Sequence, residues 1–374
     1  MKRIEWANTL RGVAVAAVLI AHLIVAFWLN QAGVAGLARR PALYDDPSMA
    51  PRWAHWVGTI PVEFAAFGVA LFFLLSGYVI AISLTRYSRR GFLVGRLTRI
   101  VPTFAAGYLV TCLVVWTAGD PGAELKFPEL LVGMVPGLPW LLHTAAPADG
   151  IVWTIVVEIA FYGVCLIVFR ALVHRWQAIV GVAVACMVIQ PLLTPFTPPP
   201  FLSGIHYIVL LACPFIPIML IGMTLSPARG EGHSVTARVA LVLALAGAYW
   251  WLASTTSVVP TPLRYRWSFL LAVLVFAAVL VMGGRWQGSR STDFMAAISY
   301  PLYVVHAVLG YFLLSLLAAH GVPPWLDLLI VTAVAIGCAW LIHVTVETPT
   351  HQVGKRWARR LSDPRGPSEG GSSA

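Results

Sequence analysis

A basic residue and a histidine stand eleven positions apart in the first apolar segment of the chain. The segment reads NTLRGVAVAAVLIAHLIVAFWL, with Arg11 near its start and His22 two-thirds of the way along. Eleven helical steps of about 100° return almost to the starting azimuth, so we expect both side chains on one face, about 16 Å apart. A buried ionisable group in an apolar helix marks a functional site, and imidazole is suited to proton transfer near neutral pH. The alternative is a structural histidine that bonds a neighbouring helix.

Glu158 is the only carboxylate deep within an apolar segment, GIVWTIVVEIAFYG. If the segments cross a membrane in alternation, Glu158 lies about 10 Å below the outer edge, at a depth similar to that of His22. A carboxylate beside an imidazole fixes its tautomer and raises its basicity. The sequence therefore predicts that Glu158 orients His22 as a general base. The alternative is a His–Glu pair that only holds the helices together.

Two arginines precede the third apolar segment, in RYSRRGFLVGRLTRIVP. Arg96 and Arg99 are three residues apart, so on a helix they point in the same direction. We place them at the N-terminal end of that helix, where the dipole also favours anions. Two guanidinium forks suit a polyphosphate such as the nucleotide part of a coenzyme. The alternative is a basic loop that contacts anionic lipid.

The composition defines the protein class in which these residues act. Hydrophobic residues make up 59% of the 374 residues and charged residues 11%. Apolar runs of about 20 residues, enough to cross a hydrocarbon layer of about 30 Å, recur along the chain. They predict an all-α, polytopic transmembrane helical bundle of about ten helices, the first of them retained rather than removed as a signal peptide. The predicted spans are 8–29, 62–84, 100–118, 151–170, 176–193, 206–225, 236–254, 267–283, 296–318 and 325–345.

The distribution of basic residues predicts the orientation. Most of the 25 Lys and Arg residues fall in alternate loops on the side of the N-terminus, from Lys2 and Arg3 to the tail at 355–365. This bias is the positive-inside pattern, which places both termini in the cytoplasm. The net charge of +10 is then a topology signal and gives no indication of nucleic-acid binding. We expect a membrane domain at 1–346 and a basic, then Gly/Ser-rich and partly disordered cytoplasmic tail at 347–374.

The remaining features are weaker. The five cysteines all lie in apolar segments without CxxC spacing, so neither a disulfide nor a metal site is expected. The loop at 30–61, which contains Arg39, Arg40, Asp45, Asp46 and Arg52, is expected to cover the outer mouth of the bundle. The apolar but proline-broken stretch within 119–150 is expected to be re-entrant or interfacial.

Five short segments in order resemble the acyltransferase 3 family of integral membrane O-acyltransferases, over nearly the whole chain. They are LRGVAVAAVLIAH at 10–22, FFLLSGYVI at 72–80, RLTRIVP at 96–102, WTIVVE at 153–158 and SYPLYVVH at 299–306. The resemblance implies an enzyme of the cytoplasmic (inner) membrane that takes an acyl group, usually acetyl, from acyl-CoA. It passes this group to a hydroxyl of a carbohydrate, exopolysaccharide, lipopolysaccharide or lipid-linked saccharide.

The resemblance also implies roles for particular residues. Arg11 and His22 match the family motif that carries the essential histidine, and Arg96 and Arg99 match the pair associated with the coenzyme phosphates. Glu158 completes the expected catalytic group. No metal is implied. Residues of the other matching segments are expected to support the substrate or the structure: Ser76, Trp153, Ser299, Tyr300, Tyr303 and His306.

Two questions of mechanism and function stay open at this point. His22 is expected either to act as a general base or to carry the acyl group as a covalent acyl-histidine. The acceptor is either a glycan, our first choice, or a small natural product such as a macrolide. A transporter or flippase is the alternative of another class, although no internal repeat of the kind typical of transporters is visible. The expected partners are membrane lipids, acyl-CoA and the acceptor, and the oligomeric state is open.

Overall fold

The computed structural model describes residues 5–38, 40–118, 127–144, 150–229, 234–283 and 289–363. Throughout these ranges the chain forms helices and turns, and no strand occurs in them. Several sequence predictions concern residues outside these ranges, and the structure does not address them. These residues are Lys2, Arg3, Arg39, Arg285, Arg365 and the Gly/Ser-rich tail after 363.

Eight helical segments of the described chain are long and apolar enough to cross a membrane. Two of them are composite, α1 with the π-helix η1 and α2, and α17 with the π-helix η5 and α18, and a third is the single long helix α6. Their bounds are Glu5–Leu19, Ile20–Ala26 and Phe27–Leu29 for the first composite, Arg89–Ala118 for α6, and Pro324–Ile342, His343–Glu347 and Thr348–Arg360 for the second composite. The others are α5 (Phe64–Arg86), α11 (Trp176–Leu193), α14 (Val235–Thr255), α15 (Leu263–Met282) and α16 (Arg290–Ala319).

Two of the ten predicted spans differ from simple crossing helices. The predicted span at 206–225 is a broken pair, α12 (Pro200–Ala212) and α13 (Ile216–Thr224), bent by 49°. Pro214 and Pro217 lie at the break and lack the N–H groups that would continue the α12 ladder. The predicted span at 151–170 is α9 (Val152–Val168), an apolar helix of 17 residues that rises only about 25 Å. With the bent pair taken as one span, up to nine helices in the described chain meet the length and composition criteria.

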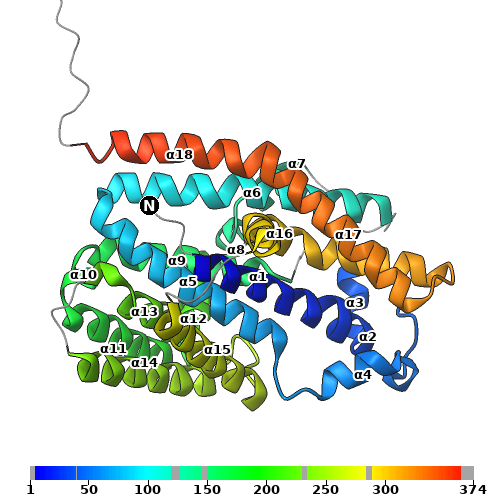
Figure 1. Ribbon diagram of the computed structural model, residues 1–374, viewed down its shortest axis with the longest axis horizontal. Coiled ribbons are helices and arrows are strands. Elements are labelled where there is room, and N and C mark those ends of the chain that lie inside the picture. Colours follow the sequence, from blue (N-terminus) through cyan, green and yellow to red (C-terminus); the bar gives the residue numbers. More distant parts are fainter. Residues whose placement is uncertain are drawn as a thin grey trace, which may run out of the picture.

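Helix α5 lies at the centre of the bundle. It packs against α1, α13 and α15, while α1 also packs along α16. The α5 and α13 backbones approach closely at Gly77 and Gly222, where a Cβ on either glycine would overlap the backbone of the other helix. In Figure 1, α11, α14 and α15 gather at the lower edge of the view, and α6 and α18 lie side by side at the upper edge. The bundle thus has a core between these two edges that contains α1, α5 and α16.

The helix boundaries follow local sequence rules. Ser289 caps α16 through a capping box with Thr292, and the Ser234 hydroxyl accepts a hydrogen bond from the Ala237 amide at the start of α14. Helices α12 and α17 begin with Pro200 and Pro324, which tolerate the first turn because its amides have no intrahelical partner. Helix α16 continues through Pro301 as one element.

Short elements close the end of the bundle that carries η1. They are α3 (Gln31–Ala38), the 3₁₀-helix η2 (Pro47–Met49) and α4 (Arg52–Thr59). Helix α4 contacts η1 and α2, and the Tyr44 hydroxyl donates to the Trp28 carbonyl. Arg264 of α15 donates to the carbonyls of Gly58, Ile60 and Val62, which anchors the segment before α5. The described part of the 30–61 loop therefore packs over this end.

The remaining connections are also short. Helices α7 (Phe127–Gly133) and α8 (Leu138–Leu142) form the described part of the 119–150 stretch, α10 (Ala171–His174) links α9 to α11, and the 3₁₀-helix η3 (Pro227–Arg229) follows α13. Helix α8 packs against α12. Gly137, with a φ of 79°, makes the turn between α7 and α8, which fits an apolar segment that folds back rather than crossing.

The C-terminal helix continues past the expected domain boundary. The segment from Pro324 to Arg360 is 37 residues long, a rise of about 55 Å, which exceeds a hydrocarbon core of about 30 Å. Its last part, THQVGKRWARR, is polar and basic and packs against the N-terminal half of α6. The proposed division at residue 346 stays a prediction, but residues 348–360 are helical rather than extended tail.

Candidate active site

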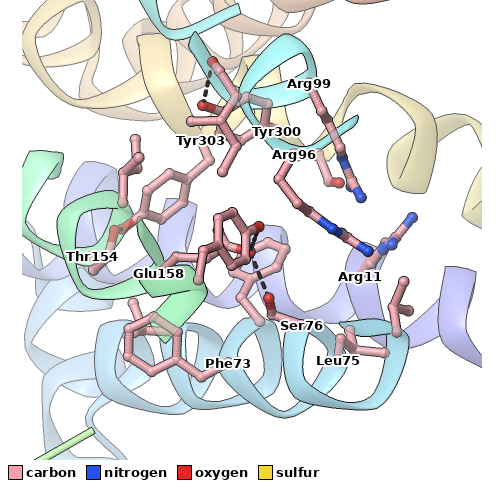
Figure 2. Close-up of a pocket in the computed structure, with 17 residues that line it drawn as sticks. Arg11, Phe73, Leu75, Ser76, Arg96, Arg99, Thr154, Glu158, Tyr300 and Tyr303 are labelled. Atoms are coloured by element: carbon pink, nitrogen blue, oxygen red, sulfur yellow. Dashed lines mark hydrogen bonds between the residues drawn. The ribbon is translucent and has the colours of Figure 1, made fainter. Parts of the chain in front are cut away.

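A cavity with about 800 Å³ of empty space, part of it open to solvent, lies between α1, α5, α6, α9 and α16. We call it the inner cavity. Its wall is mixed: aromatic and aliphatic side chains from α5 and α9 face a polar side that carries three arginines and one carboxylate (Figure 2). The polar lining consists of Arg11, Ser76, Arg96, Arg99, Thr154, Glu158, Tyr162, Ser299, Tyr300 and Tyr303.

Three guanidinium groups converge at one end of the inner cavity. Arg11 comes from α1, and Arg96 and Arg99 come from consecutive turns of α6 (Figure 2). Within the described part of the chain, neither Arg11 nor Arg99 has a hydrogen-bond or ion-pair partner at contact distance. Like charges that converge without local partners are suited to bind an anion with several oxygens.

Arg96 is held in place, in contrast to its two neighbours. It is 8% exposed, donates to the Ser83 hydroxyl, and lies over the rings of Phe92 and Tyr162 at 5.7 and 5.8 Å. The prediction that Arg96 and Arg99 lie at a helix N-terminus is wrong, because α6 begins at Arg89, about two turns earlier. The polar residues before 96 extend the helix beyond the apolar span, so the anion-binding character rests on the guanidinium groups and not on a helix dipole.

Glu158 of α9 also faces the inner cavity. Its Oε1 atom accepts hydrogen bonds from the Ser76 hydroxyl of α5 at 2.5 Å and from the Tyr162 hydroxyl at 2.7 Å (Figure 2). Tyr162 is four residues further along α9, so the two side chains meet on one helix face. Because the Tyr162 ring also lies under Arg96, the carboxylate belongs to the arginine end of the site.

His22 lies in η1, where the wider π-helical turn interrupts the α1 helix. Its Nδ1 atom is 2.6 Å from the Tyr311 hydroxyl of α16, and its ring meets the His306 ring edge-to-face at 4.9 Å between centroids. His22 is half-buried, and His306 is fully buried. We call His22 and His306 the histidine pair.

The expected pairing of Glu158 with His22 is not found. The partner of the His22 ring is Tyr311, and the described hydrogen bonds of Glu158 go to Ser76 and Tyr162. The two residues were placed together because their depths matched, but depth does not determine the lateral position of a helix. Helix α9 packs mainly against α12, whereas α1 packs against α5 and α16.

Helix α16 connects the two ends of the site. Ser299, Tyr300 and Tyr303 line the inner cavity, and His306 and Tyr311 contact His22. Arg11 and His22 therefore both lie on the side of α1 that faces α16, as their spacing predicted. Tyr303 is the link, since its hydroxyl bonds Thr154 at 2.7 Å and its ring lies 5.6 Å from that of His306. The rise from Tyr300 to Tyr311 is about 16 Å.

The other predicted support residues divide into two groups. Ser76, Ser299, Tyr300 and Tyr303 line the inner cavity. Trp153 does not, because its ring packs 5.3 Å from Phe215 at the break between α12 and α13. The next residue, Thr154, lines the cavity instead, and neither Thr154 nor Tyr311 was identified from the sequence. Nothing in the sequence alone points to Tyr311, because its role depends on how α16 packs against η1.

A second, wider cavity of about 1,900 Å³ adjoins the inner cavity. We call it the wide chamber. The two share lining residues, among them Arg11, Arg96, Arg99 and Tyr300, which form their junction. The wide chamber is also lined by five residues that the sequence analysis did not assign to the site, because four of them fall in the predicted cytoplasmic tail at 347–374 and His343 falls in the predicted span at 325–345. They are His343, Glu347, His351, Lys355 and Arg359.

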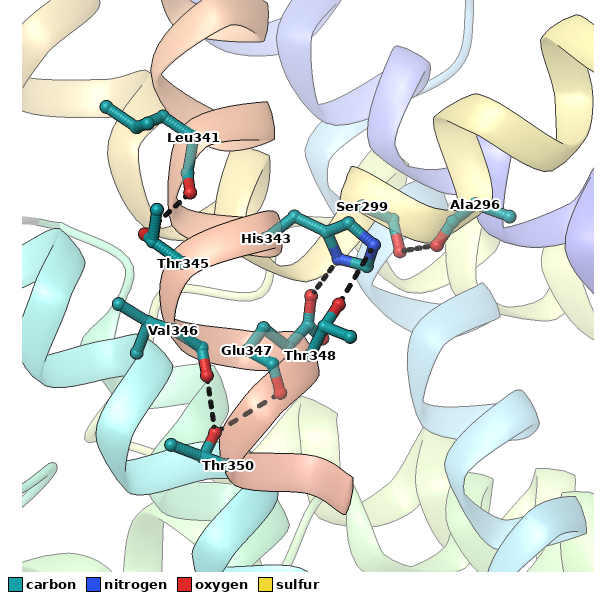
Figure 3. A network of polar contacts seen from close by, with 9 residues as sticks. All are labelled: Ala296, Ser299, Leu341, His343, Thr345, Val346, Glu347, Thr348 and Thr350. Carbon is teal, nitrogen blue, oxygen red and sulfur yellow. Dashed lines mark hydrogen bonds and ion pairs between the residues drawn. The ribbon is translucent and has the colours of Figure 1, made fainter. Parts of the chain in front are cut away.

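A local polar network stands at the wall of the wide chamber. His343 Nδ1 and Glu347 Oε2 are hydrogen-bonded at 2.7 Å across η5, and the Thr348 hydroxyl lies 3.4 Å from the other ring nitrogen (Figure 3). Among the described residues that line the chamber, Glu347 is the only one with a carboxylate. No group of three or more potential metal ligands occurs among the described residues. The chamber is therefore dominated by positive charge.

Comparisons with known proteins complete the description of the site. A family model described as "Acyltransferase domain" matches residues 4–344, which include Arg11, His22, Arg96, Arg99, Glu158 and His306. The search of curated proteins gave no match, and the search of solved structures gave none either. The match covers nine-tenths of the chain and agrees with the apolar, all-helical architecture. The chain belongs to the acyltransferase 3 family and is a multi-pass membrane acyltransferase.

Proposed function

We propose that the protein transfers an acyl group, in the first instance acetyl, from acyl-CoA to a hydroxyl of a carbohydrate. The observation that carries this proposal is the convergence of Arg11, Arg96 and Arg99 at the junction of the two cavities. A diphosphate offers several anionic oxygens in one place, and three guanidinium groups match it better than they match a single carboxylate. The inner cavity would then hold the pantetheine arm.

The spacing of the two ends supports a donor in this position. A pantetheine arm is about 15–20 Å long, close to the rise of about 16 Å from Tyr300 to Tyr311 along α16. With the diphosphate at the junction, the arm would run past Ser299 and Tyr303 and bring the thioester towards the histidine pair. The apolar wall of the cavity, which includes Val69 and Phe72, suits the thioester end.

In this proposal His22 is the general base. In the tautomer with its proton on Nδ1, His22 donates to the Tyr311 oxygen and keeps a lone pair on Nε2. Nε2 takes the proton of the acceptor hydroxyl while the hydroxyl oxygen forms a bond to the carbonyl carbon of the thioester. The C–S bond then breaks, and the proton on His22 passes to the leaving thiolate of coenzyme A. Tyr311, rather than Glu158, orients the base.

The acceptor is proposed to be a glycan or a lipid-linked saccharide at the cytoplasmic (inner) membrane. His22, which is half-buried, lies at the end of the bundle that α3 and α4 close, opposite the wide chamber, so donor and acceptor would enter from different ends. This separation favours an acceptor on the far side of the membrane from the coenzyme pool. A saccharide acceptor offers hydroxyl groups as nucleophiles. One base, His22, is then enough to remove the proton of the hydroxyl that attacks the thioester.

The experiment is acyl transfer by the purified protein in lipid nanodiscs. Labelled acetyl-CoA is supplied together with membrane saccharide extracts, and the product is identified by mass spectrometry. Wild-type protein should form an O-acetylated saccharide, and His22→Ala should not. The matched control is His320→Ala, which removes an exposed histidine outside the site. Full activity in His22→Ala, or absence of transfer by the wild type with every acceptor, would contradict the proposal.

A further inference from the structure

The wide chamber has a wall that lies beyond the family-matched residues. The match ends at residue 344, yet Glu347, His351, Lys355 and Arg359 line the chamber. These residues belong to η5 and α18, which in Figure 1 extend along α6 at the upper edge of the molecule. The family assignment therefore gives no role to this wall.

Small residues set the position of α18 against α6. Gly91 and Gly95 are four residues apart on α6, and Gly354 and Ala358 are four apart on α18. A Cβ at Gly91 would overlap the Ala358 carbonyl, and a Cβ at Gly354 would overlap the Thr98 side chain. This pattern of paired small residues permits two helix backbones to approach closely. The placement of α18 is thus encoded in both helices.

The two helices are also joined at their ends. The Ser88 amide donates to the Ser362 hydroxyl at 2.9 Å, and the Ser88 hydroxyl donates to the Leu361 carbonyl at 2.8 Å. Ser88 directly precedes α6, and Leu361 and Ser362 follow α18, so the helices run antiparallel. These contacts fix the rotation of α18 about its own axis.

That rotation points one stripe of α18 into the wide chamber. Glu347, His351, Lys355 and Arg359 recur every fourth residue and lie on one side of the helix. Lys355 and Arg359 are as exposed as their neighbours Arg356 and Arg360, but only Lys355 and Arg359 line the chamber. Arg356 and Arg360, about 100° further round the same helix, therefore provide a matched basic pair that does not line the chamber.

The charges of the chamber form two groups. Apart from Arg86, which has an interaction of its own, the cations of the lining are the junction, with Arg11, Arg96 and Arg99, and the stripe with Lys355 and Arg359. His351 lies between them, within electrostatic range of Arg99, Lys355, Arg96 and Arg11. Among the described residues neither Lys355 nor Arg359 has a hydrogen-bond or ion-pair partner. Two separate cationic groups in one cavity suit a ligand with two separate anionic groups.

We propose that Lys355 and Arg359 bind the 3′-phosphate of the adenosine in the acyl-CoA donor, while the junction arginines bind its diphosphate. This inference rests on the proposed function and adds a subsite to it. A phosphate monoester is a compact anion with three terminal oxygens, which an ammonium and a guanidinium bind together. With this subsite the enzyme selects a donor whose adenosine carries the 3′-phosphate. An anionic lipid headgroup has the same phosphate chemistry, and the experiment separates the two sources.

The first measurement compares two donors, acetyl-CoA and acetyl-3′-dephospho-CoA. In nanodiscs of phosphatidylcholine alone, wild-type protein should prefer acetyl-CoA by about tenfold or more in kcat/KM, because charge-assisted hydrogen bonds are about twice as strong as neutral ones. The Lys355→Gln/Arg359→Gln double variant should use both donors at the rate at which wild type uses the dephospho form. The Arg356→Gln/Arg360→Gln control should keep the preference.

The second measurement does not need turnover. Adenosine 3′,5′-bisphosphate is added to each protein, and its dissociation constant is obtained from thermal shift. Wild type and the Arg356→Gln/Arg360→Gln control should bind it about tenfold or more tightly than they bind adenosine 5′-phosphate. The Lys355→Gln/Arg359→Gln variant should bind both nucleotides equally. A third arm repeats the shift with phosphatidylglycerol in the nanodisc.

The outcomes separate this inference from the proposed function. Transfer from both donors at equal rates by the wild type would overturn the 3′-phosphate subsite and leave the acyltransferase proposal intact. A preference that survives in the Lys355→Gln/Arg359→Gln variant would also overturn it. Stabilisation by phosphatidylglycerol alone, lost in the same variant, would assign the stripe to lipid instead. Selective binding of the bisphosphate without transfer from either donor would support the subsite and contradict the proposed reaction.

Discussion

The two ends of the site differ in the kind of group they present. The junction and the wide chamber contain arginines and a lysine, several of them without a local partner, in an open and polar space. The histidine pair lies among Tyr303, Tyr311 and Phe27, and the described ring contacts of the pair involve no arginine, lysine, aspartate or glutamate. Permanent charge at one end suits binding of an anion, whereas neutral imidazole and phenol at the other suit movement of a proton.

This difference indicates that one substrate must span both ends of the site. A cluster of arginines beside the reacting atoms would hold a carboxylate or a phosphate as the reacting group. Here the clusters are separated along α16 by about 16 Å, so the anionic part of the donor lies far from the bond that breaks. Tyr303 stands between them, because it lines the inner cavity and its ring lies 5.6 Å from that of His306. Variants at the two ends should therefore affect different kinetic constants.

The largest effect is expected at the histidine pair. We expect His22→Ala to lower kcat by about 10²–10⁴-fold, the usual contribution of a general base, and to leave donor affinity unchanged. Steady-state kinetics and binding of a non-hydrolysable acetyl-CoA analogue provide the two measurements. His320→Ala is the control. A variant that loses donor binding together with kcat would contradict the separation of the two ends.

The next largest effect is expected at the junction. Arg99→Gln removes a guanidinium without a local partner, and the donor KM should rise by about 10–100-fold with a smaller change in kcat. Arg90→Gln, on the exposed face of the same helix, should leave KM unchanged. Salt titration adds a second readout, because the contribution of Arg99 to donor affinity should weaken as ionic strength rises. A loss confined to kcat would argue that Arg99 acts at the reacting atoms.

A smaller change in kcat/KM is expected for the two variants that test whether Glu158 acts on His22. Tyr311→Phe removes the hydroxyl next to His22 Nδ1, and Glu158→Gln removes a charge next to Ser76 and Tyr162. Each should lower kcat/KM by about tenfold, and the double variant should show the product of the two effects, because the side chains belong to separate networks. Tyr249→Phe removes a buried hydroxyl outside the site and serves as control. Strong non-additivity would restore the direct pairing of Glu158 and His22.

The sequence identified many of the residues of this site, but it did not predict which side chains they contact. Arg11 and His22 were placed on one face by spacing alone, and α1 and η1 present them to α16, because helical periodicity is a local property. Glu158 was correctly recognised as a buried acid, but its partner was not, since hydropathy reports depth and not which helices are neighbours. Tyr311, Lys355 and Arg359 were missed for the same reason: their roles arise from the packing of α16 on η1 and of α18 on α6. The bend between α12 and α13 could have been inferred from Pro214 and Pro217.

The smallest effect is expected where α18, which forms a wall of the wide chamber, packs against α6. Gly354→Ala would place a methyl group on Thr98 and push α18 away from α6. We expect a loss of about 1–3 kcal/mol in stability, as for other overpacked contacts, and a modest rise in donor KM with kcat unchanged. The measurement is thermal unfolding in detergent together with donor kinetics.

Gly337→Ala is the matched control for this change. Gly337 lies in α17 with open space where its Cβ would be, so alanine should be neutral or stabilise the helix by about 0.5–1 kcal/mol. If Gly354→Ala behaved like Gly337→Ala, the close contact of α18 with α6 would not be what positions the stripe of α18. A rise in donor KM without loss of stability would indicate that α18 moves as a unit, since its other contacts at Ser88 and Ser362 keep it attached.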